Sequence, residues 1–223
     1  MKITAIKYGQ SRMQESLVFD GGRTDATHPI SFLVYLIEVD DRKILVDAGC
    51  TTMPDCWKME HFCGVMPILK QLDLSPEDIT DVILTHAHHD HIESVSAFTN
   101  ATVYIQQDEL SLGRSYLPQT MTVMPFADDC TVYSGIRAVK VGGHSIGSPV
   151  VQIATDNTVY VITGDECYAM ECLTKKILTG ASCNREQSQY FIETYSQPCY
   201  TPLLCHDGTV LPDQNGYQVI YNV

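Results

Sequence analysis

Short runs of apolar and β-branched residues recur along the chain, and polar turns separate them. Runs of this kind, bounded by turn residues, are typical of buried strands. The segment ISFLVYLIEV (residues 30–39) turns through DDRK into ILVDAG (residues 44–49), which predicts a hairpin that ends near Asp47 and Gly49. Further strands are predicted at residues 1–10, 81–85, 101–106, 136–141, 149–154, 158–163, 200–205 and 217–223.

Helical segments lie between these strands. PILKQLDL, ESVSAF and NREQSQYFIETY are predicted helices, and SPEDI offers Ser75 as an N-cap with Pro76 after it. Residues 51–66 and 112–131 show no clear period, and we expect them to form walls of a pocket. Two groups of strands, with helices between them and no linker, predict a layered α/β fold in one domain over residues 1–223.

Charge and composition narrow the possible partners. The formal net charge is −13, and no run of Lys or Arg interrupts the acidic surface. Because such a surface repels phosphates, we expect no nucleic-acid partner. The first residues lack the apolar core of a signal peptide, and no segment is apolar over about eighteen residues. We therefore expect a cytoplasmic protein that does not cross a membrane.

Half of the eight histidines crowd into one segment, DVILTHAHHDH (residues 81–91). Side chains at positions i and i+2 of an extended backbone point the same way, so His86 and His88 can bind one metal ion at the end of a strand. A turn then brings Asp90 and His91 toward a second ion. His89 has the opposite phase and is not an expected ligand. Imidazole and carboxylate donors suit zinc, and also iron or manganese.

One strand end cannot fill two coordination shells, because each ion needs about four ligands. Three later segments place a suitable residue directly after a predicted strand: KVGGHSIGS contains His144, VYVITGDE contains Asp165 and TPLLCHDG contains His206. The two carboxylate oxygens of Asp165 can bridge two ions. The remaining histidines, His28 and His61, are expected at the surface or in ordinary hydrogen bonds.

The segment THAHHDH matches the H-x-H-x-D-H signature of the metallo-β-lactamase superfamily, and ILVDAG, GGHSIGS, TGDE and LLCHDG resemble its other motifs in order. The resemblance spans residues 30–208 and implies a four-layer αββα sandwich with a metal site at one edge. It also places Asp47 where the family has a carboxylate that orients a ligand histidine. It divides the ligands between two ions, one bound by His86, His88 and His144, the other by Asp90, His91 and His206, with Asp165 bridging.

The nine cysteines include no Cys-x-x-Cys pair, which argues against a zinc ribbon. Most are expected to be small buried apolar residues. Cys167 and Cys205 lie close to predicted ligands, and some true β-lactamases of the superfamily use a thiolate ligand. Nitrogen and oxygen donors already occupy all the usual positions, so neither cysteine is expected to bind metal.

This ligand set implies a dinuclear metal-dependent hydrolase, in which a hydroxide shared by two divalent ions attacks a carbonyl of a small ester or lactone. Asp90 is a candidate catalytic residue as well as a ligand. Tyr168 lies three residues after Asp165, as a tyrosine does in the N-acyl homoserine lactonases of the superfamily. That resemblance implies a lactone substrate and a Tyr168 hydroxyl that donates to the carbonyl oxygen as charge develops there.

Other members of the superfamily fit less well. Glyoxalase II carries a helical C-terminal domain, whereas only a short strand-like segment follows His206, so a compact thioesterase of this type stays an alternative. A transfer-RNA-processing nuclease needs a basic arm, which neither the length nor the charge of the chain supports; a phosphodiesterase stays an alternative. Flavodiiron proteins have glutamate at the position of His88, and sulfur dioxygenases use one iron. A non-catalytic metal sensor is disfavoured because all seven predicted ligands are present.

Overall fold

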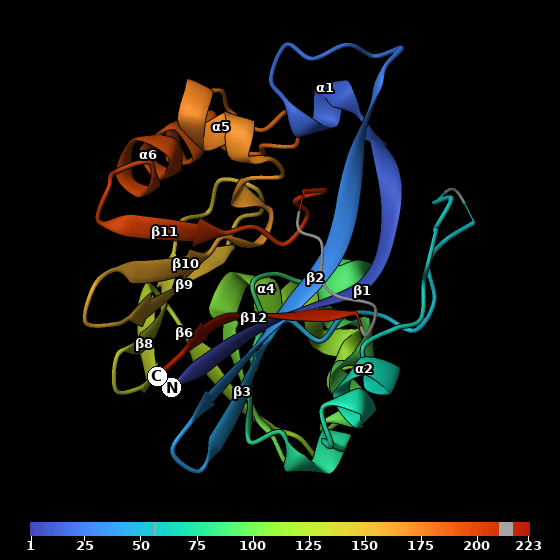
Figure 1. Cartoon of the computed structure of the whole chain (residues 1–223), viewed down its shortest axis with the longest axis vertical. Helices are drawn as coiled ribbons and strands as arrows, with labels where there is room; N and C mark the ends of the chain where they lie inside the picture. The colour runs from blue at the N-terminus through green and yellow to red at the C-terminus, as the bar shows by residue number, and fades with distance from the viewer. Residues whose placement is uncertain (56, 210–215) are drawn as a thin grey trace.

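The computed structural model describes residues 1–55, 57–209 and 216–223, and its strands form two sheets (Figure 1). The first sheet has seven strands in the order β12 (Tyr217–Asn222), β1 (Lys2–Gln14), β2 (Thr27–Val39), β3 (Arg42–Val46), β4 (Asp81–Ile83), β5 (Thr102–Gln106) and β6 (Thr122–Phe126). The second has five in the order β11 (Tyr200–Leu203), β10 (Val159–Ile162), β9 (Pro149–Ala154), β8 (Ile136–Lys140) and β7 (Asp129–Tyr133).

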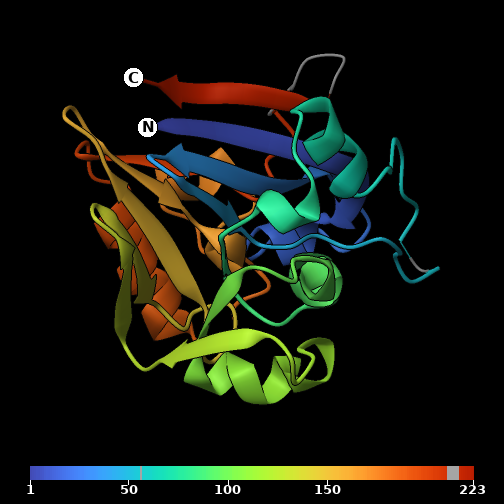
Figure 2. The ribbon, with the colours of Figure 1, turned by 90° about the horizontal axis from the view of Figure 1, so that it is seen from below.

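Helices cover the outer faces of both sheets, which confirms the predicted αββα sandwich (Figures 1 and 2). The α-helices are α1 (Glu15–Val18), α2 (Met66–Gln71), α3 (His89–Ile92), α4 (Gln107–Gly113), α5 (Met170–Lys175) and α6 (Arg185–Tyr195). Short 3-10 helices are η1 (Pro76–Asp78), η2 (Glu93–Ala97), η3 (Arg114–Tyr116) and η4 (Gly164–Glu166). Among the described residues, no helix has the length and apolar character needed to span a bilayer.

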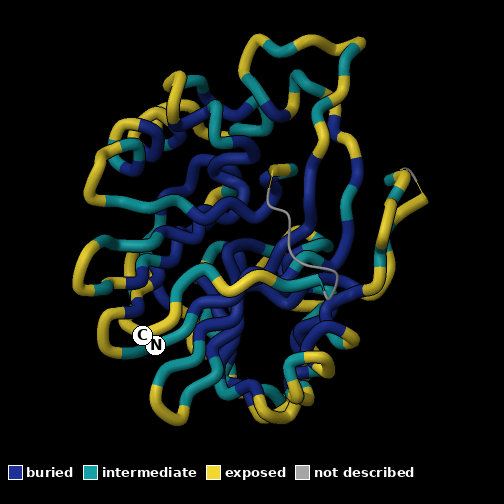
Figure 3. Tube along the Cα trace, in the orientation of Figure 1, coloured by how far each residue is buried: buried dark blue, intermediate teal, exposed yellow. Residues whose placement is uncertain are grey.

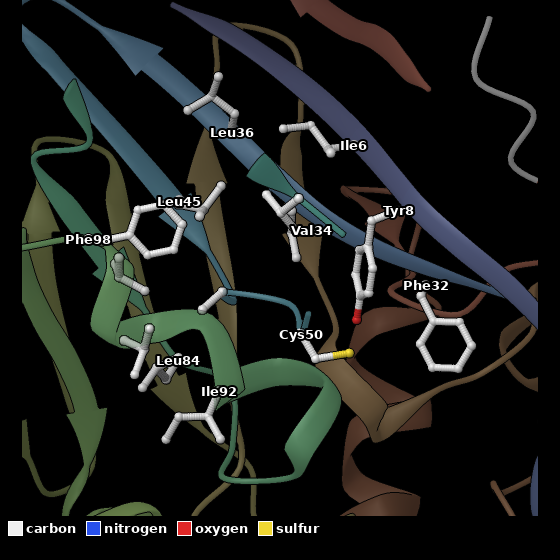
Figure 4. Packing of buried hydrophobic residues seen from close by; sticks show 14 of the residues in the cluster. Ile6, Tyr8, Phe32, Val34, Leu36, Leu45, Cys50, Leu84, Ile92 and Phe98 are labelled. Carbon is white, nitrogen blue, oxygen red and sulfur yellow. The ribbon is translucent and has the colours of Figure 1, made fainter. Parts of the chain in front are cut away.

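Strand β2 is buried on both faces from Ile30 to Ile37 (Figure 3). Because neighbouring side chains of a strand point to opposite faces, one set packs under the helices and the other between the sheets. Phe32, Val34 and Leu36 belong to the cluster beneath α2 and η2, and Figure 4 shows Leu36 near Leu45 and Phe98. Leu33, Tyr35 and Ile37 face the five-stranded sheet. A third cluster lies between that sheet and helices α5 and α6.

The predicted strands are all present, but residues 112–131 are more ordered than their pattern suggests. They contain β6 and the start of β7, and α4 begins just before them. Strand β6 lies at the edge of its sheet and is largely exposed, so its residues do not alternate between apolar and polar. Pro125 also obscures the pattern, although an edge strand tolerates a residue that has no N–H. Helix α5 is also absent from the elements that the sequence predicts.

Strand direction explains why the predicted ligands meet. Strands β3 and β4 are parallel, so Asp47 and His86 follow the same ends of neighbouring strands. Strands β10 and β11 are parallel, and β8 shares their direction because β9 is antiparallel to both β8 and β10. The residues that follow β8, β10 and β11 therefore emerge at one edge of the five-stranded sheet.

The two sheets are joined by hydrogen bonds beside this edge. Residues that follow β11 pair with β2 of the other sheet: the N–H of Leu33 donates to the carbonyl of Cys205 at 3.0 Å, and the N–H of Ser31 donates to that of His206 at 3.2 Å. The Tyr35 hydroxyl donates to the Leu204 carbonyl at 2.7 Å. His206 is thus fixed at the seam between the sheets.

An ion pair between Arg42 and Asp81 ties β3 to β4. The Asp81 carboxylate is fully buried and accepts from Arg42 Nε at 2.7 Å, while the Arg42 side chain is 32% exposed. We expect Arg42→Ala to lower the free energy of unfolding by about 2–3 kcal/mol, somewhat less than for a fully buried pair, because it leaves a buried carboxylate without its cation. Urea unfolding measures the change. The exposed pair of Arg23 and Asp25 is the control, and Arg23→Ala should change nothing measurable; equal effects of the two variants would contradict the expectation.

Candidate metal centre

The histidine cluster follows β4 as an extended segment and then a helical turn. His88 has φ −70° and ψ 151°, and α3 begins at the next residue. The extended part aligns His86 with His88, and the turn of α3 carries Asp90 and His91 to the other side, as the spacing predicts. Among the described residues, seven side chains form two groups whose donor atoms lie within 4.8 Å of one another. One group is His86, His88, His144 and Asp165; the other is Asp90, His91 and His206.

Imidazole nitrogens converge at the first group. His88 Nδ1 lies 2.9 Å from His86 Nε2 and 3.0 Å from His144 Nε2. His86 and His144 are buried, whereas His88 is exposed and closes the group on the solvent side. Three donor atoms therefore surround one point just below the surface.

The second group is built in the same way. His91 Nε2 and His206 Nε2 lie 3.3 Å apart, and Asp90 Oδ2 lies 3.5 Å from the first and 3.6 Å from the second. Both imidazoles are buried, while the Asp90 side chain is 19% exposed. Asp90 thus lies on the side of this group that faces the solvent.

Asp165 joins the two groups. Its Oδ1 lies 3.1 Å from both His91 Nε2 and His206 Nε2. Its Oδ2 lies 3.7 Å from His86 Nε2 and 3.5 Å from His144 Nε2. One oxygen thus faces each group, which is the arrangement expected of a carboxylate that bridges two ions.

The hydrogen bonds behind the imidazoles fix which nitrogen carries the proton. His91 Nδ1 donates to Asp47 at 2.8 Å, His206 Nδ1 to the Ser31 carbonyl at 2.8 Å, and His144 Nδ1 to the Ala181 carbonyl at 3.1 Å. Each of these acceptors requires N–H at Nδ1, which leaves Nε2 as a bare lone pair in a neutral ring. Nitrogen lone pairs that face one another at about 3 Å repel unless a cation lies between them.

Two further observations agree with a bound cation. Asp165 Oδ1 is buried and accepts no hydrogen bond, so it keeps free electron pairs for an ion. Burial lowers the pKa of His86 and His144. Burial acts in the same direction on His91, but the carboxylates of Asp165, Asp90 and Asp47 outweigh it and raise that pKa. The residues therefore fit divalent ions, since imidazole and carboxylate are suitable donors and the carboxylates favour positive charge at the site.

Asp47 supports both groups from behind. Besides its contact with His91, its carboxylate accepts from the Thr85 N–H at 2.8 Å and from Thr85 Oγ1 at 2.9 Å. Thr85 Oγ1 in turn lies 3.1 Å from His86 Nδ1, in position to accept from it. The predicted contact with a histidine is present, and a second path runs through Thr85, a residue that the sequence pattern does not single out.

Tyr168 lies beside the bridging carboxylate. Its hydroxyl donates to Asp165 Oδ2 at 2.8 Å, and its ring stacks on that of His206 at 5.2 Å with an angle of 18°. Burial, followed by the charge of Asp165, raises its pKa well above the ordinary value, so the hydroxyl stays protonated and remains a donor.

Other residues near the centre have different roles. Cys167 and Cys205 belong to neither group; Cys167 donates to the Ala169 carbonyl at 3.1 Å, and the Cys205 sulfur lies 4.0 Å from Asp47 Oδ2. Burial raises the pKa of both thiols well above the ordinary value. His28 packs edge-on against Phe19 at 5.2 Å, and His61 is exposed. All four lie outside the two groups.

His89 faces away from both groups and holds the neighbouring loop. Its Nε2 donates to the Thr52 carbonyl at 2.7 Å, and its Nδ1 lies 3.4 Å from the Tyr116 hydroxyl. The Glu93 carboxylate accepts from the Thr51 N–H at 2.7 Å. The loop over residues 51–66, in which Cys56 lies outside the described residues, is thus attached to the turn that carries the predicted ligands.

An aromatic chain links this loop to the centre. Trp57 packs edge-on against Phe32 at 5.9 Å, and Phe32 packs in the same way against His206 at 5.1 Å. The Tyr8 ring lies 5.9 Å from that of Phe32, and its hydroxyl donates to the Asp90 carbonyl at 2.6 Å. In Figure 4, Tyr8, Phe32 and Cys50 lie together on the outer side of the seven-stranded sheet.

Two buried acids near His144, Glu166 and Glu109, are not among the predicted site residues. Glu166 accepts from the N–H groups of Gly143 and His144 at 3.0 and 3.2 Å and from the Ser148 hydroxyl at 2.5 Å. Burial raises its pKa to about 7. Glu109 contacts the same loop from the other side. Glu166 could have been singled out from the sequence only because it directly follows Asp165. Nothing in the sequence of α4 indicates that Glu109 is buried near the site.

Comparisons with known proteins agree with this geometry. The sequence model described as the Metallo-beta-lactamase superfamily matches residues 33–177. An N-acyl homoserine lactonase from Bacillus cereus is 27% identical over 163 residues, which cover 61% of this chain and 64% of that protein. N-acyl homoserine lactonase AiiB from Rhizobium rhizogenes is 33% identical over 104 residues, 40% of this chain and 36% of that protein. The aligned part thus spans less than two thirds of either relative.

Solved structures share the fold over almost the whole chain. An N-acyl homoserine lactone hydrolase, solved with N-hexanoyl-L-homoserine at its catalytic metal centre, superposes with a TM-score of 0.77 at 21% identity and covers 92% of this chain and 93% of its own. A probable metal-dependent hydrolase from Staphylococcus aureus superposes with a TM-score of 0.78 at 20% identity, over 92% of this chain and 88% of its own.

Proposed function

Since the chain belongs to the metallo-β-lactamase superfamily, we propose that it is a cytoplasmic hydrolase that binds two divalent metal ions and opens a lactone ring, such as that of an N-acyl homoserine lactone. N-acyl homoserine lactonases are among the relatives that align with it, which supports the choice of substrate. Imidazole and carboxylate donors favour zinc, and the same donors accept iron or manganese.

The position of Asp165 carries this proposal. Its two oxygens are divided between two clusters of imidazole nitrogens, and each cluster has its own hydrogen-bonded support. A site for one ion needs only one cluster. A buried carboxylate with a purely structural role would accept hydrogen bonds with both of its oxygens, whereas Asp165 Oδ1 accepts none. Two ions explain both observations.

When bound, two such ions lower the pKa of a shared water and polarise a carbonyl oxygen. The residues of the chain provide the rest. The Asp90 side chain is 19% exposed, compared with 4% for Asp165, so Asp90 faces an incoming substrate and can carry a proton to the leaving oxygen. The Tyr168 hydroxyl can turn from Asp165 to donate to the carbonyl oxygen as negative charge builds there.

We expect Tyr168→Phe to lower lactone turnover by about 10-fold to 100-fold and to leave the metal content unchanged. The variant loses one donor to the developing charge but keeps the ring that stacks on His206. Steady-state kinetics and metal analysis of the same preparation test this. Tyr195→Phe is the control, because it removes another tyrosine hydroxyl, which pairs with Gln152 beneath α6. Unchanged turnover in Tyr168→Phe would leave that residue a packing role only.

The proposed function is tested by metal analysis followed by a substrate screen. Purified protein should contain about two metal ions per chain, and the metal-loaded protein should hydrolyse lactones faster than thioesters, β-lactams and phosphodiesters. Protein without bound metal, with its sequence intact, would refute the metal centre. A preference for thioesters would instead indicate the glyoxalase II type of activity, and two bound ions without any turnover would indicate a metal-binding protein that is not an enzyme.

A further inference from the structure

Glu109 is a buried acid that the proposed reaction does not use. It lies in the first turn of α4 and is 1% exposed. Its Oε2 accepts from the N–H of Ala87 at 3.0 Å. Its Oε1 accepts from the Ser145 hydroxyl at 2.6 Å and from the N–H of Gly147 at 2.9 Å. Three neutral donors therefore converge on one carboxylate in the interior.

The position of these donors relates Glu109 to the first group of predicted ligands. Ala87 lies between His86 and His88, and Ser145 directly follows His144. The two loops that Glu109 joins thus carry all three imidazoles of that group. The loops are far apart in the sequence, and a shift between them would change the distance of 3.0 Å between His88 Nδ1 and His144 Nε2.

Close packing at Gly147 makes this connection rigid. A Cβ atom on Gly147 would lie 2.9 Å from Glu109 Cγ and 2.2 Å from Gln106 Oε1, so only glycine allows the loop to approach this closely. Gln106 is fully buried; its Oε1 accepts from the Asp108 N–H at 2.6 Å, and its Nε2 donates to the Ala127 carbonyl at 2.9 Å. The loop with His144 therefore rests on a fixed helix end.

The second group has different supports. Its residues are held by Tyr8 at Asp90, by Asp47 at His91 and by Ser31 at His206. We propose that Glu109 is a positioning residue that sets the separation of the two loops and thereby the affinity for the ion bound by His86, His88 and His144. This inference rests on the proposed metal centre and predicts an effect on one ion only.

The test measures zinc affinity in two backgrounds, each of which keeps one group intact. His206→Ala impairs the second group and His144→Ala the first. Metal-free protein is titrated with zinc in competition with a chromophoric chelator. In the His206→Ala background, Glu109→Gln should weaken zinc binding by about 10-fold to 100-fold, because the amide NH₂ would face one of the donors and push the loops apart. In the His144→Ala background the change should stay below about threefold.

Two variants control for charge and for folding. Asp129→Asn removes an exposed acid that pairs with Arg137 and is no partner of either loop, and should leave both affinities unchanged. Ser145→Ala removes one of the three hydrogen bonds and decides the question if Glu109→Gln does not fold. It should weaken zinc binding by about 2-fold to 10-fold in the His206→Ala background alone.

Equal losses in both backgrounds would overturn the inference, because they would show that Glu109 acts on the fold as a whole. Unchanged affinity in both would overturn it as well. These outcomes differ from a failure of the proposed function, which would appear as an unsubstituted protein that binds no zinc at all.

Discussion

Replacing Asp165 by alanine is expected to remove both metal ions and to lower turnover by more than about 100-fold. The loss of a residue that only supports a ligand typically costs about 10-fold to 100-fold in metal affinity or activity. Asp165 contacts both groups directly, with Oδ1 at 3.1 Å from two imidazole nitrogens and Oδ2 at 3.5 and 3.7 Å from two others. The loss should therefore exceed that range. Metal content per chain and lactone kinetics on the same sample measure it.

The asparagine variant sharpens this prediction. An amide has one acceptor oxygen, so Asp165→Asn can serve one group only and should retain about one ion per chain. Asp20→Asn controls for the loss of one negative charge, because Asp20 is a surface acid that pairs with Arg185. Two tightly bound ions in Asp165→Ala would show that the carboxylate does not bridge them.

Replacing Asp47 by asparagine is expected to weaken the binding of both ions by about 10-fold to 100-fold each. The carboxylate orients His91 directly and His86 through Thr85, so one change affects both groups. Asparagine is preferred to alanine because residue 47 has φ +64°, a conformation that asparagine tolerates far better. Zinc titration of the metal-free protein against a competing chelator gives both affinities.

Thr85→Val separates the two paths. It removes the hydroxyl between Asp47 and His86 and leaves the hydrogen bond from His91 to Asp47 in place. Only the ion at the first group should then bind more weakly. Equal weakening of both ions would refute the connection through Thr85, and affinities within about twofold in Asp47→Asn would refute the supporting role of Asp47.

The sequence predicts most of the fold and the seven candidate ligands because the signals are local. The candidate ligands lie in the turns and the short helix that come after apolar strands, and the spacing of His86 and His88 is enough to place them on one side of an extended backbone. Strand β6 was not predicted because it is exposed at the edge of its sheet, where no burial enforces a pattern. Its Pro125 argues against a strand until the edge position is known.

The supporting residues could not be predicted for a different reason. Glu109 and its partners Ala87 and Gly147 are separated by 22 and 38 residues, and nothing in the segment QDELSLG distinguishes a buried acid from a surface one. The path from Asp47 through Thr85 to His86 also depends on the pairing of β3 with β4. Interactions of this kind follow from tertiary packing, which a single sequence does not reveal.

Bound metal would also act on the unfolded chain. The first group of ligands connects residues 56 positions apart, and the second connects residues 115 positions apart, across the seam between the sheets. Permanent cross-links that close loops of this size restrict the unfolded ensemble by about 4 to 5 kcal/mol each. Metal ions impose such a constraint only while they stay bound, so the resistance of this chain to unfolding should rise with the concentration of free metal around it. Metal supply would then govern how long the protein survives as well as how fast it works.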